Sequence, residues 1–120
     1  MQLLKNDYKT LVTLDKAAHT RNVTSDYLLI EDGQVWPLQT ELDSFYAGQP
    51  DKNRSRNDFF TIKHFSMAGN MAYIVWHLRS EYLTNGKLVK EKVWNETGVF
   101  RKEKGRWKMA LLHSSPAPKQ

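Results

Sequence analysis

The dipeptide Asn85-Gly86 constrains the fold of this chain more than any other feature. It separates two strand-like runs, MAYIVWHLRSEYLT (71–84) and KLVKEKVWNETGVFR (87–101). Asn-Gly between alternating apolar residues is the strongest short signal of a two-residue hairpin turn. The turn predicts that Thr84 pairs with Lys87. Counting back along both strands then places Trp76 opposite Asn95.

A second turn follows at KEKG (102–105) and leads into RWKMALLHSS (106–115). Its glycine is typical of a three-residue hairpin loop closed by a left-handed residue. This loop pairs Lys102 with Arg106 and brings Asn95 opposite His113. The second half of the chain is therefore predicted to form an antiparallel sheet of hairpin-linked strands.

The predicted register assigns side chains to two faces, because side chains alternate across a sheet. The more apolar face is expected to meet the helices and contains Trp76, Asn95, Thr97, Trp107, Met109, Leu111 and His113. The opposite face is mixed, with an apolar centre formed by Val75, Trp94, Phe100 and Leu112. A broad face with exposed apolar groups is typical of a partner interface, so these four residues are predicted to be buried in a homodimer.

The first half of the chain reads as helices with one short strand. Apolar residues at helical spacing predict a helix from Leu3 to about Thr20, and Pro37 opens a second one at Leu38–Ala47. Tyr27–Ile30 is predicted to be a short buried strand before an Asp32-Gly33 turn, and Phe59–Met67 a further strand. Helices followed by hairpin-linked strands indicate an α+β domain with the helices on one face of the sheet.

Composition limits the classes of function. The length of 120 residues suits one domain, spanning residues 1–120, and the net charge of +5 comes from basic residues that are scattered among acidic ones. We therefore expect a solvated surface and no nucleic-acid partner. No apolar run is long enough for a bilayer and no secretion signal opens the chain, so neither a membrane partner nor export is expected. The absence of cysteine is compatible with a cytoplasmic protein.

Trp76, Asn95 and His113 are predicted to lie side by side on the helix-facing side. A buried Asn and a buried His need hydrogen-bond partners, so they either satisfy each other in the core or line a cavity between sheet and helices. In the second case the predicted ligand-binding residues are Trp76, Asn95, Thr97, Met109 and His113, with Tyr27 and Phe45 from the helix side. Such a cavity suits a small, partly hydrophobic molecule.

Catalysis in this cavity would depend on His113 as acid or base, with Asn95 orienting it. No second titratable group is firmly placed beside it; Asp26, Asp58 and Glu91 are the remaining candidates. The four histidines show no paired spacing, so no metal site is expected. No cofactor motif is present either.

The closing segment VWNETGVFRKEKGRWKMALLHSSPAP (93–118) resembles the last hairpin of the nuclear transport factor 2-like superfamily. The resemblance is strongest to its SnoaL-like branch and to the association domain of calcium/calmodulin-dependent kinase. It rests on Glu96-Thr97, Phe100, Gly105-x-Trp107 and His113-x-Ser115. It implies a cone-shaped α+β barrel, a curved sheet over N-terminal helices with a cavity inside, and dimers or larger rings built through the outer sheet face.

Members of this superfamily include isomerases, dehydratases, cyclases and association modules that are not enzymes, so the fold does not decide the function. Three functions stay open from the sequence. The domain binds a small, partly hydrophobic molecule and self-associates; or it is an enzyme of the isomerase, dehydratase or cyclase type that uses His113; or it is a pure oligomerisation module whose cavity is filled by side chains.

Overall fold

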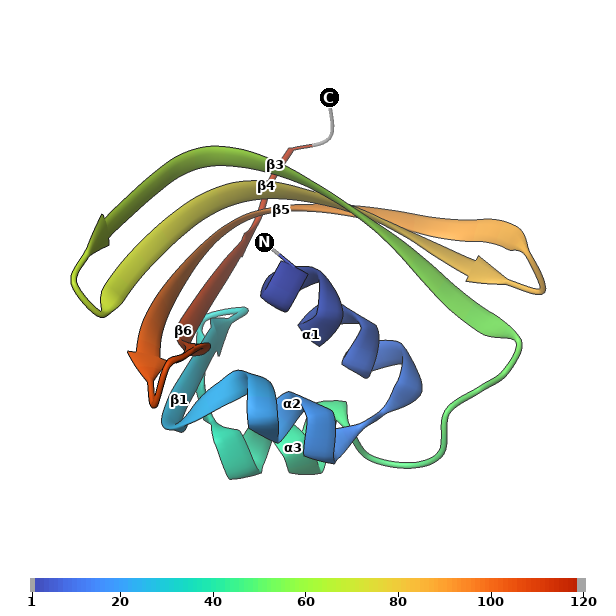
Figure 1. Cartoon of the computed structure of the whole chain (residues 1–120). Coiled ribbons are helices and arrows are strands. Elements are labelled where there is room, and N and C mark those ends of the chain that lie inside the picture. The colour runs from blue at the N-terminus through green and yellow to red at the C-terminus, as the bar shows by residue number, and fades with distance from the viewer. Residues whose placement is uncertain (1, 119–120) are drawn as a thin grey trace.

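The computed structural model describes residues 2–118. Three helices lie under the concave side of a strongly curved sheet (Figure 1). The elements follow one another as α1 (Gln2–Thr13), α2 (Lys16–Asn22), β1 (Val23–Glu31), β2 (Gln34–Pro37), α3 (Leu38–Phe45), β3 (Arg54–Ala68), β4 (Met71–Thr84), β5 (Lys87–Glu103) and β6 (Arg106–Pro116). The predicted α+β class and the cone-like form are confirmed, and the curved sheet is not closed into a barrel.

The N-terminal segment forms two helices instead of the single helix predicted from Leu3 to Thr20. Leu14 adopts a left-handed backbone with φ of 56°, which ends α1. Asp15 then caps α2, where its side chain accepts a hydrogen bond of 3.0 Å from the backbone of Ala18. Periodicity alone missed this break because Leu14 is neither Gly nor Pro.

The third helix begins where the sequence predicted, directly after Pro37, but it ends at Phe45 instead of Ala47. The strand predicted at Phe59–Met67 is present within a longer one, since β3 extends from Arg54 to Ala68. The strand predicted at Tyr27–Ile30 likewise lies inside β1.

The sheet has the order β2-β1-β6-β5-β4-β3, with β1 and β6 parallel and the other neighbours antiparallel. The Asn85-Gly86 turn is confirmed: both residues have positive φ, and Thr84 pairs with Lys87. The KEKG turn differs from its prediction. Lys104 and Gly105 form a two-residue turn with positive φ at both positions, so Arg106 pairs with Glu103 and not with Lys102.

Bulges shift the register further along both hairpins. Tyr82 pairs with Lys90 while Leu83 pairs with Leu88, so Val89 is the extra residue on β5. Trp76 therefore lies opposite Glu96, and the predicted pairing with Asn95 is wrong. A second bulge on β6 leaves Ala110 unpaired, and a third on β3 does the same for Lys63. Bulges of this kind bend a strand and increase its twist, which suits the curvature of this sheet.

The bulge at Val89 reverses the faces predicted for β5. Trp94, Glu96, Gly98 and Phe100 share the concave face with Trp76, whereas Asn95, Thr97 and Val99 point outward. On β6, Met109 and Leu112 face the helices, and Leu111 and His113 face outward. A shift of one residue is enough for this, because the side-chain period of a strand is two.

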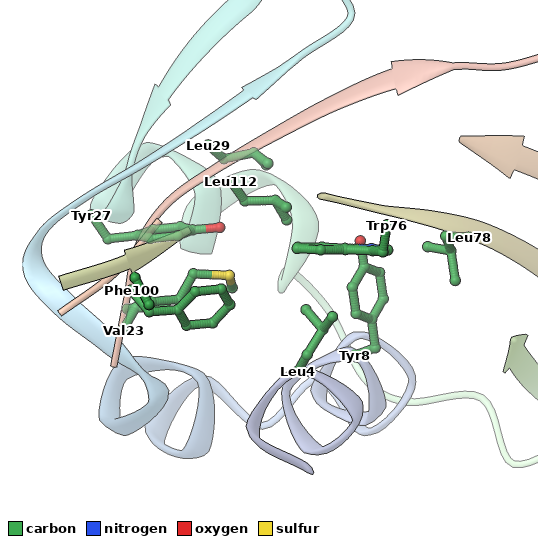
Figure 2. Close-up of a cluster of buried hydrophobic side chains, with 11 residues drawn as sticks. Leu4, Tyr8, Val23, Tyr27, Leu29, Trp76, Leu78, Phe100 and Leu112 are labelled. Atoms are coloured by element: carbon green, nitrogen blue, oxygen red, sulfur yellow. The ribbon is translucent and has the colours of Figure 1, made fainter. Parts of the chain in front are cut away.

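The hydrophobic core lies between α1, α2 and the concave face (Figure 2). Trp76 and Leu78 of β4 are fully buried at its centre, and Leu4 and Tyr8 of α1 pack against the same cluster. Met109 and Phe100 fill the side towards β1. The helix-facing positions predicted for Trp76, Trp107 and Met109 are confirmed, while the one predicted for Leu111 is wrong.

Candidate functional site

A cavity of about 550 Å³ lies between the helices and the concave face of the sheet. Its aromatic walls come from six residues: Tyr8, Tyr27, Phe45, Tyr46, Tyr82 and Trp94. Its acidic lining comes from another six, Asp7, Glu31, Asp32, Glu41, Glu91 and Glu96, and its basic lining from His19, Arg56 and Lys92. A concave space of this size with apolar walls and a few polar groups is the usual form of a small-molecule site.

His19 of α2 sits between two carboxylates at the cavity wall. Its Nδ1 is 2.8 Å from Oδ1 of Asp7 on α1, and its Nε2 is 2.6 Å from Oε1 of Glu41 on α3. Asn22 also donates to Oδ1 of Asp7, at 3.0 Å. The cluster joins all three helices, and His19, Asp7 and Glu41 are all buried.

The two carboxylates keep His19 protonated. Burial by itself lowers the pKa of this imidazole, but the hydrogen bonds and charges of Asp7 and Glu41 outweigh it and raise the pKa from 6.5 to about 9. The ring stacks on Tyr46 with centroids 4.8 Å apart, and it meets the ring of Tyr27 edge-on at 5.7 Å. At neutral pH the cavity wall therefore carries an imidazolium held between two carboxylates.

Glu96 provides a third buried carboxyl in the same cavity. Its Oε1 accepts hydrogen bonds from the Tyr8 hydroxyl and, at 3.0 Å, from the indole Nε1 of Trp76. Burial raises the pKa of Glu96 despite these hydrogen bonds. Burial together with the charge of Glu96 also raises the pKa of Tyr8, so the phenol stays a donor.

Arg56 of β3 occupies an aromatic cage at the cavity wall. Its guanidinium carbon lies 5.0 Å from the ring centroid of Tyr8, 5.1 Å from that of Tyr82 and 5.7 Å from that of Trp94. Its Nε donates to Asp58 at 2.7 Å. The cation is thus already paired with a carboxylate and covered by aromatic faces.

The sequence predicted the cavity position of some residues correctly and assigned others to an interface. Tyr27 and Phe45, predicted on the helix side of the cavity, do line it. Trp94 and Leu112, predicted at an interface, line the same cavity because the bulges turn them inward. Phe100, also predicted at the interface, is buried in the core.

The other predicted ligand-binding residues lie outside the cavity. Trp76 and Met109 are part of the packed core. Asn95, Thr97 and His113 point from the outer face of the sheet, where Thr97 pairs with His113 and the Asn95 amide oxygen lies 3.3 Å from Nδ1 of His77. The proposed pair of His113 and Asn95 therefore does not reach the cavity.

The outer face nevertheless holds a continuous apolar row, made of other residues than the four that the sequence predicted there. Residues paired across four strands form it: Leu28 of β1, Leu111 of β6, Val99 of β5 and Tyr73 of β4. We call these four residues the outer apolar row. Val75, predicted at the interface, lies beside it in the next row, where it pairs with Thr97.

Sequence reasoning missed Asp7, His19, Glu41, Arg56 and Glu96. The spacing of twelve residues between Asp7 and His19 crosses the break at Leu14, so no helical period relates them. Glu96 carried a usable signal, because it alternates with Trp94, Gly98 and Phe100 as a buried strand position would.

Within residues 2–118, no group of three or more His, Asp or Glu side chains has an arrangement that could hold a metal ion. None of the helices in that part of the chain has the length and apolar character needed to cross a bilayer.

No protein-family model matches the sequence, and no curated protein matches it. Solved structures do match along almost the whole chain. The association domain of C. elegans CaMKII superposes with a TM-score of 0.77 at 15% identity, covering 95% of this chain and 90% of that one. An NTF-2 like protein of unknown function from Shewanella oneidensis gives 0.73 at 24% identity, with 95% and 93% covered.

A nuclear transport factor 2 (NTF2-like) superfamily protein from Salmonella enterica gives a TM-score of 0.74 at 17% identity, covering 96% of this chain and 87% of that one. Identities this low carry information about architecture and not about activity. Together with the curved sheet and its helices, they show that this chain has the α+β fold of the nuclear transport factor 2-like superfamily.

Proposed function

We propose that this domain binds a small, partly apolar molecule in its cavity and self-associates through the outer face of its sheet. The observation that carries the first part is the open volume of about 550 Å³ inside the fold. A pure oligomerisation module would fill that space with side chains. Here the large residues Trp76 and Met109 pack into the neighbouring core and leave the cavity open.

The self-association is supported by the outer apolar row and by the relatives of this fold. Leu28 and Tyr73 of the row are exposed, with 37% and 44% of their surface accessible. Contiguous apolar surface on a sheet face is typical of an interface. One similar structure is described as an association domain. A homodimer of standard size would bury about 800 Å² on each partner.

A second candidate function is acid–base catalysis of the isomerase, dehydratase or cyclase type. Glu96 favours it, because a buried carboxyl with a raised pKa beside an open cavity is a suitable proton donor or acceptor. It replaces His113 as the candidate acid or base. Proton exchange of a bound carbonyl compound that disappears in Glu96→Gln would establish this activity.

The binding function is tested by a thermal-shift screen of small, partly apolar compounds. Each hit is measured again with Phe45→Ala, which alters a cavity wall, and with Phe65→Ala, an exposed phenylalanine on β3 that is not part of the cavity lining. We expect Phe45→Ala to remove the stabilisation and Phe65→Ala to keep it. Hits that stabilise all three proteins equally would place the ligand elsewhere.

A further inference from the structure

The acidic residues of this chain are concentrated in the cavity although the protein as a whole is basic. Six of its 13 Asp and Glu residues line the cavity, against two of its 18 Lys and Arg residues. Of those two, Arg56 is paired with Asp58, and Lys92 is exposed. The cavity surface therefore carries an excess of acidic side chains, whereas the protein as a whole has a net positive charge.

Part of the excess negative charge of the cavity lies at a defined position, the Asp7–His19–Glu41 cluster. Both ring nitrogens of His19 face a carboxylate oxygen, so both carry a hydrogen and the ring has a single positive charge. One imidazolium between two carboxylates leaves one negative charge uncompensated. Asp7 receives both of its hydrogen bonds on Oδ1, and His19 reaches Glu41 on Oε1, so the second oxygen of each carboxylate is not used within the cluster.

Tyr27 supplies an independent indication of a ligand on the same wall. Its side chain is almost completely buried and lines the cavity, and its hydroxyl has no hydrogen-bond partner among residues 2–118. Figure 2 shows this hydroxyl at the inner end of the ring, pointing from β1 towards the interior. The ring contacts His19 edge-on. A buried polar group without a partner is uncommon and calls for an explanation.

We propose that the ligand of this cavity is a small organic cation, an amine with an apolar body, whose ammonium group lies beside the Asp7–His19–Glu41 cluster. The ammonium supplies the missing positive charge, and its N–H groups donate to the unused carboxylate oxygens and to the Tyr27 oxygen. The aromatic side chains of Phe45, Tyr82 and Trp94 enclose the apolar body. This inference rests on the proposed function, because it requires that the cavity binds a small molecule.

An anionic ligand is the opposite assignment, and its partner inside the cavity would be Arg56, because Lys92 is exposed. That guanidinium already has Asp58 at 2.7 Å and Ser80 at 3.2 Å, and its faces are covered by aromatic rings. A carboxylate would also meet the six acidic side chains of the lining. The charge distribution therefore favours the cation.

The test compares three ligands with the same phenylethyl body and end groups of different charge by isothermal titration calorimetry at pH 7: 2-phenylethylamine, 2-phenylethanol and 3-phenylpropionate. We expect the amine to bind at least about tenfold more tightly than the alcohol, and the carboxylate to bind most weakly. Equal or tighter binding of the alcohol or carboxylate, lost in Phe45→Ala, would overturn the cation assignment and leave the binding function standing. If none of the three ligands binds at millimolar concentration, the cation assignment is also overturned. The thermal-shift screen of small, partly apolar compounds would then decide separately whether the cavity binds a ligand.

Variants of the cluster test its role in selectivity. Glu41→Gln removes the surplus negative charge, so we expect the amine to lose its advantage over the alcohol. Asp43→Asn on the same helix removes an exposed carboxyl and should leave the advantage intact. Asp7→Asn is the alternative if Glu41→Gln does not fold. Selectivity that survives loss of either carboxylate in a folded protein would contradict the assigned position.

Discussion

The indole ring of Trp76 lies directly on the backbone of Gly98. A Cβ atom added at Gly98 would stand 2.8 Å from Cη2 of Trp76 and 2.8 Å from Cε2 of Phe100. Neither neighbour is the end of a flexible chain, since both are aromatic rings in the packed core. Gly98 is thus required by close packing and not by its backbone angles.

Gly98→Ala should therefore destabilise the fold by about 1–3 kcal/mol, the usual cost of overpacking a core. Thr97→Ala, at the neighbouring outward-facing position, is the matched control and should change stability by less than about 0.5 kcal/mol. Urea denaturation measures both. A Gly98→Ala protein as stable as the wild type would show that the ring can move away freely.

His19 should make the stability of the protein depend on pH. The folded protein holds the His19 proton more tightly than the unfolded chain, because its pKa rises from 6.5 to about 9. The stabilisation is fully present below pH 6.5, declines as the pH rises and is lost above about pH 9. A shift of this size corresponds to roughly 3 kcal/mol.

Chemical denaturation between pH 6 and pH 10 would measure this loss. His19→Gln should flatten the profile, while His77→Gln on the outer face should keep it. A wild-type protein whose unfolding free energy is constant over that range would contradict the charged cluster.

Arg56 and Arg54 offer a comparison of a buried and an exposed ion pair on one strand. The Arg56 side chain is 10% exposed, whereas that of Arg54 is 75% exposed and pairs with Asp51 at 3.5 Å. Arg56→Gln leaves Asp58 without its charged partner and should cost about 3 kcal/mol. Arg54→Gln should cost less than about 1 kcal/mol.

Arg56→Lys should not restore the stability, because an ammonium group lacks the flat, multidentate form that meets Asp58, Ser80 and the aromatic rings together. Thermal denaturation of Arg54→Gln, Arg56→Gln and Arg56→Lys measures these differences in stability. Equal losses of stability in Arg54→Gln and Arg56→Gln would show that the buried ion pair contributes no more than the exposed one.

Self-association should depend on the outer apolar row. Leu111→Asp introduces a charge into its middle and should give monomers by light scattering. Val89→Asp, which changes an exposed apolar residue on the β4–β5 hairpin, is the matched control and should leave the assembly unchanged. A wild-type protein that is monomeric at high concentration would exclude this assembly altogether.

Much of the order of the elements was available from local signals, although the break between α1 and α2 and the short strand β2 were not. Asn85-Gly86, Asp32-Gly33 and Pro37 each act through the backbone preferences of one or two residues, so turns and a helix start could be read without knowing the rest of the fold. The closing hairpin also carried enough pattern to predict the fold, which the solved structures support. Tyr27 and Phe45 were predicted on the helix side of the cavity and both line it, although Tyr27 belongs to a strand of the sheet and only Phe45 to a helix.

The faces of β5 and β6, and with them the candidate functional site, were decided only by the tertiary structure. The extra residue at Val89 has no strong local signature, yet it exchanges Asn95 for Glu96 on the concave face. The cluster of Asp7, His19 and Glu41 depends on how three helices pack over the sheet. Local sequence determines turns and helix starts, because those are set by neighbouring dihedral angles. Strand register and buried charge pairs depend on contacts between distant residues, and a single bulge reverses which side chains make them.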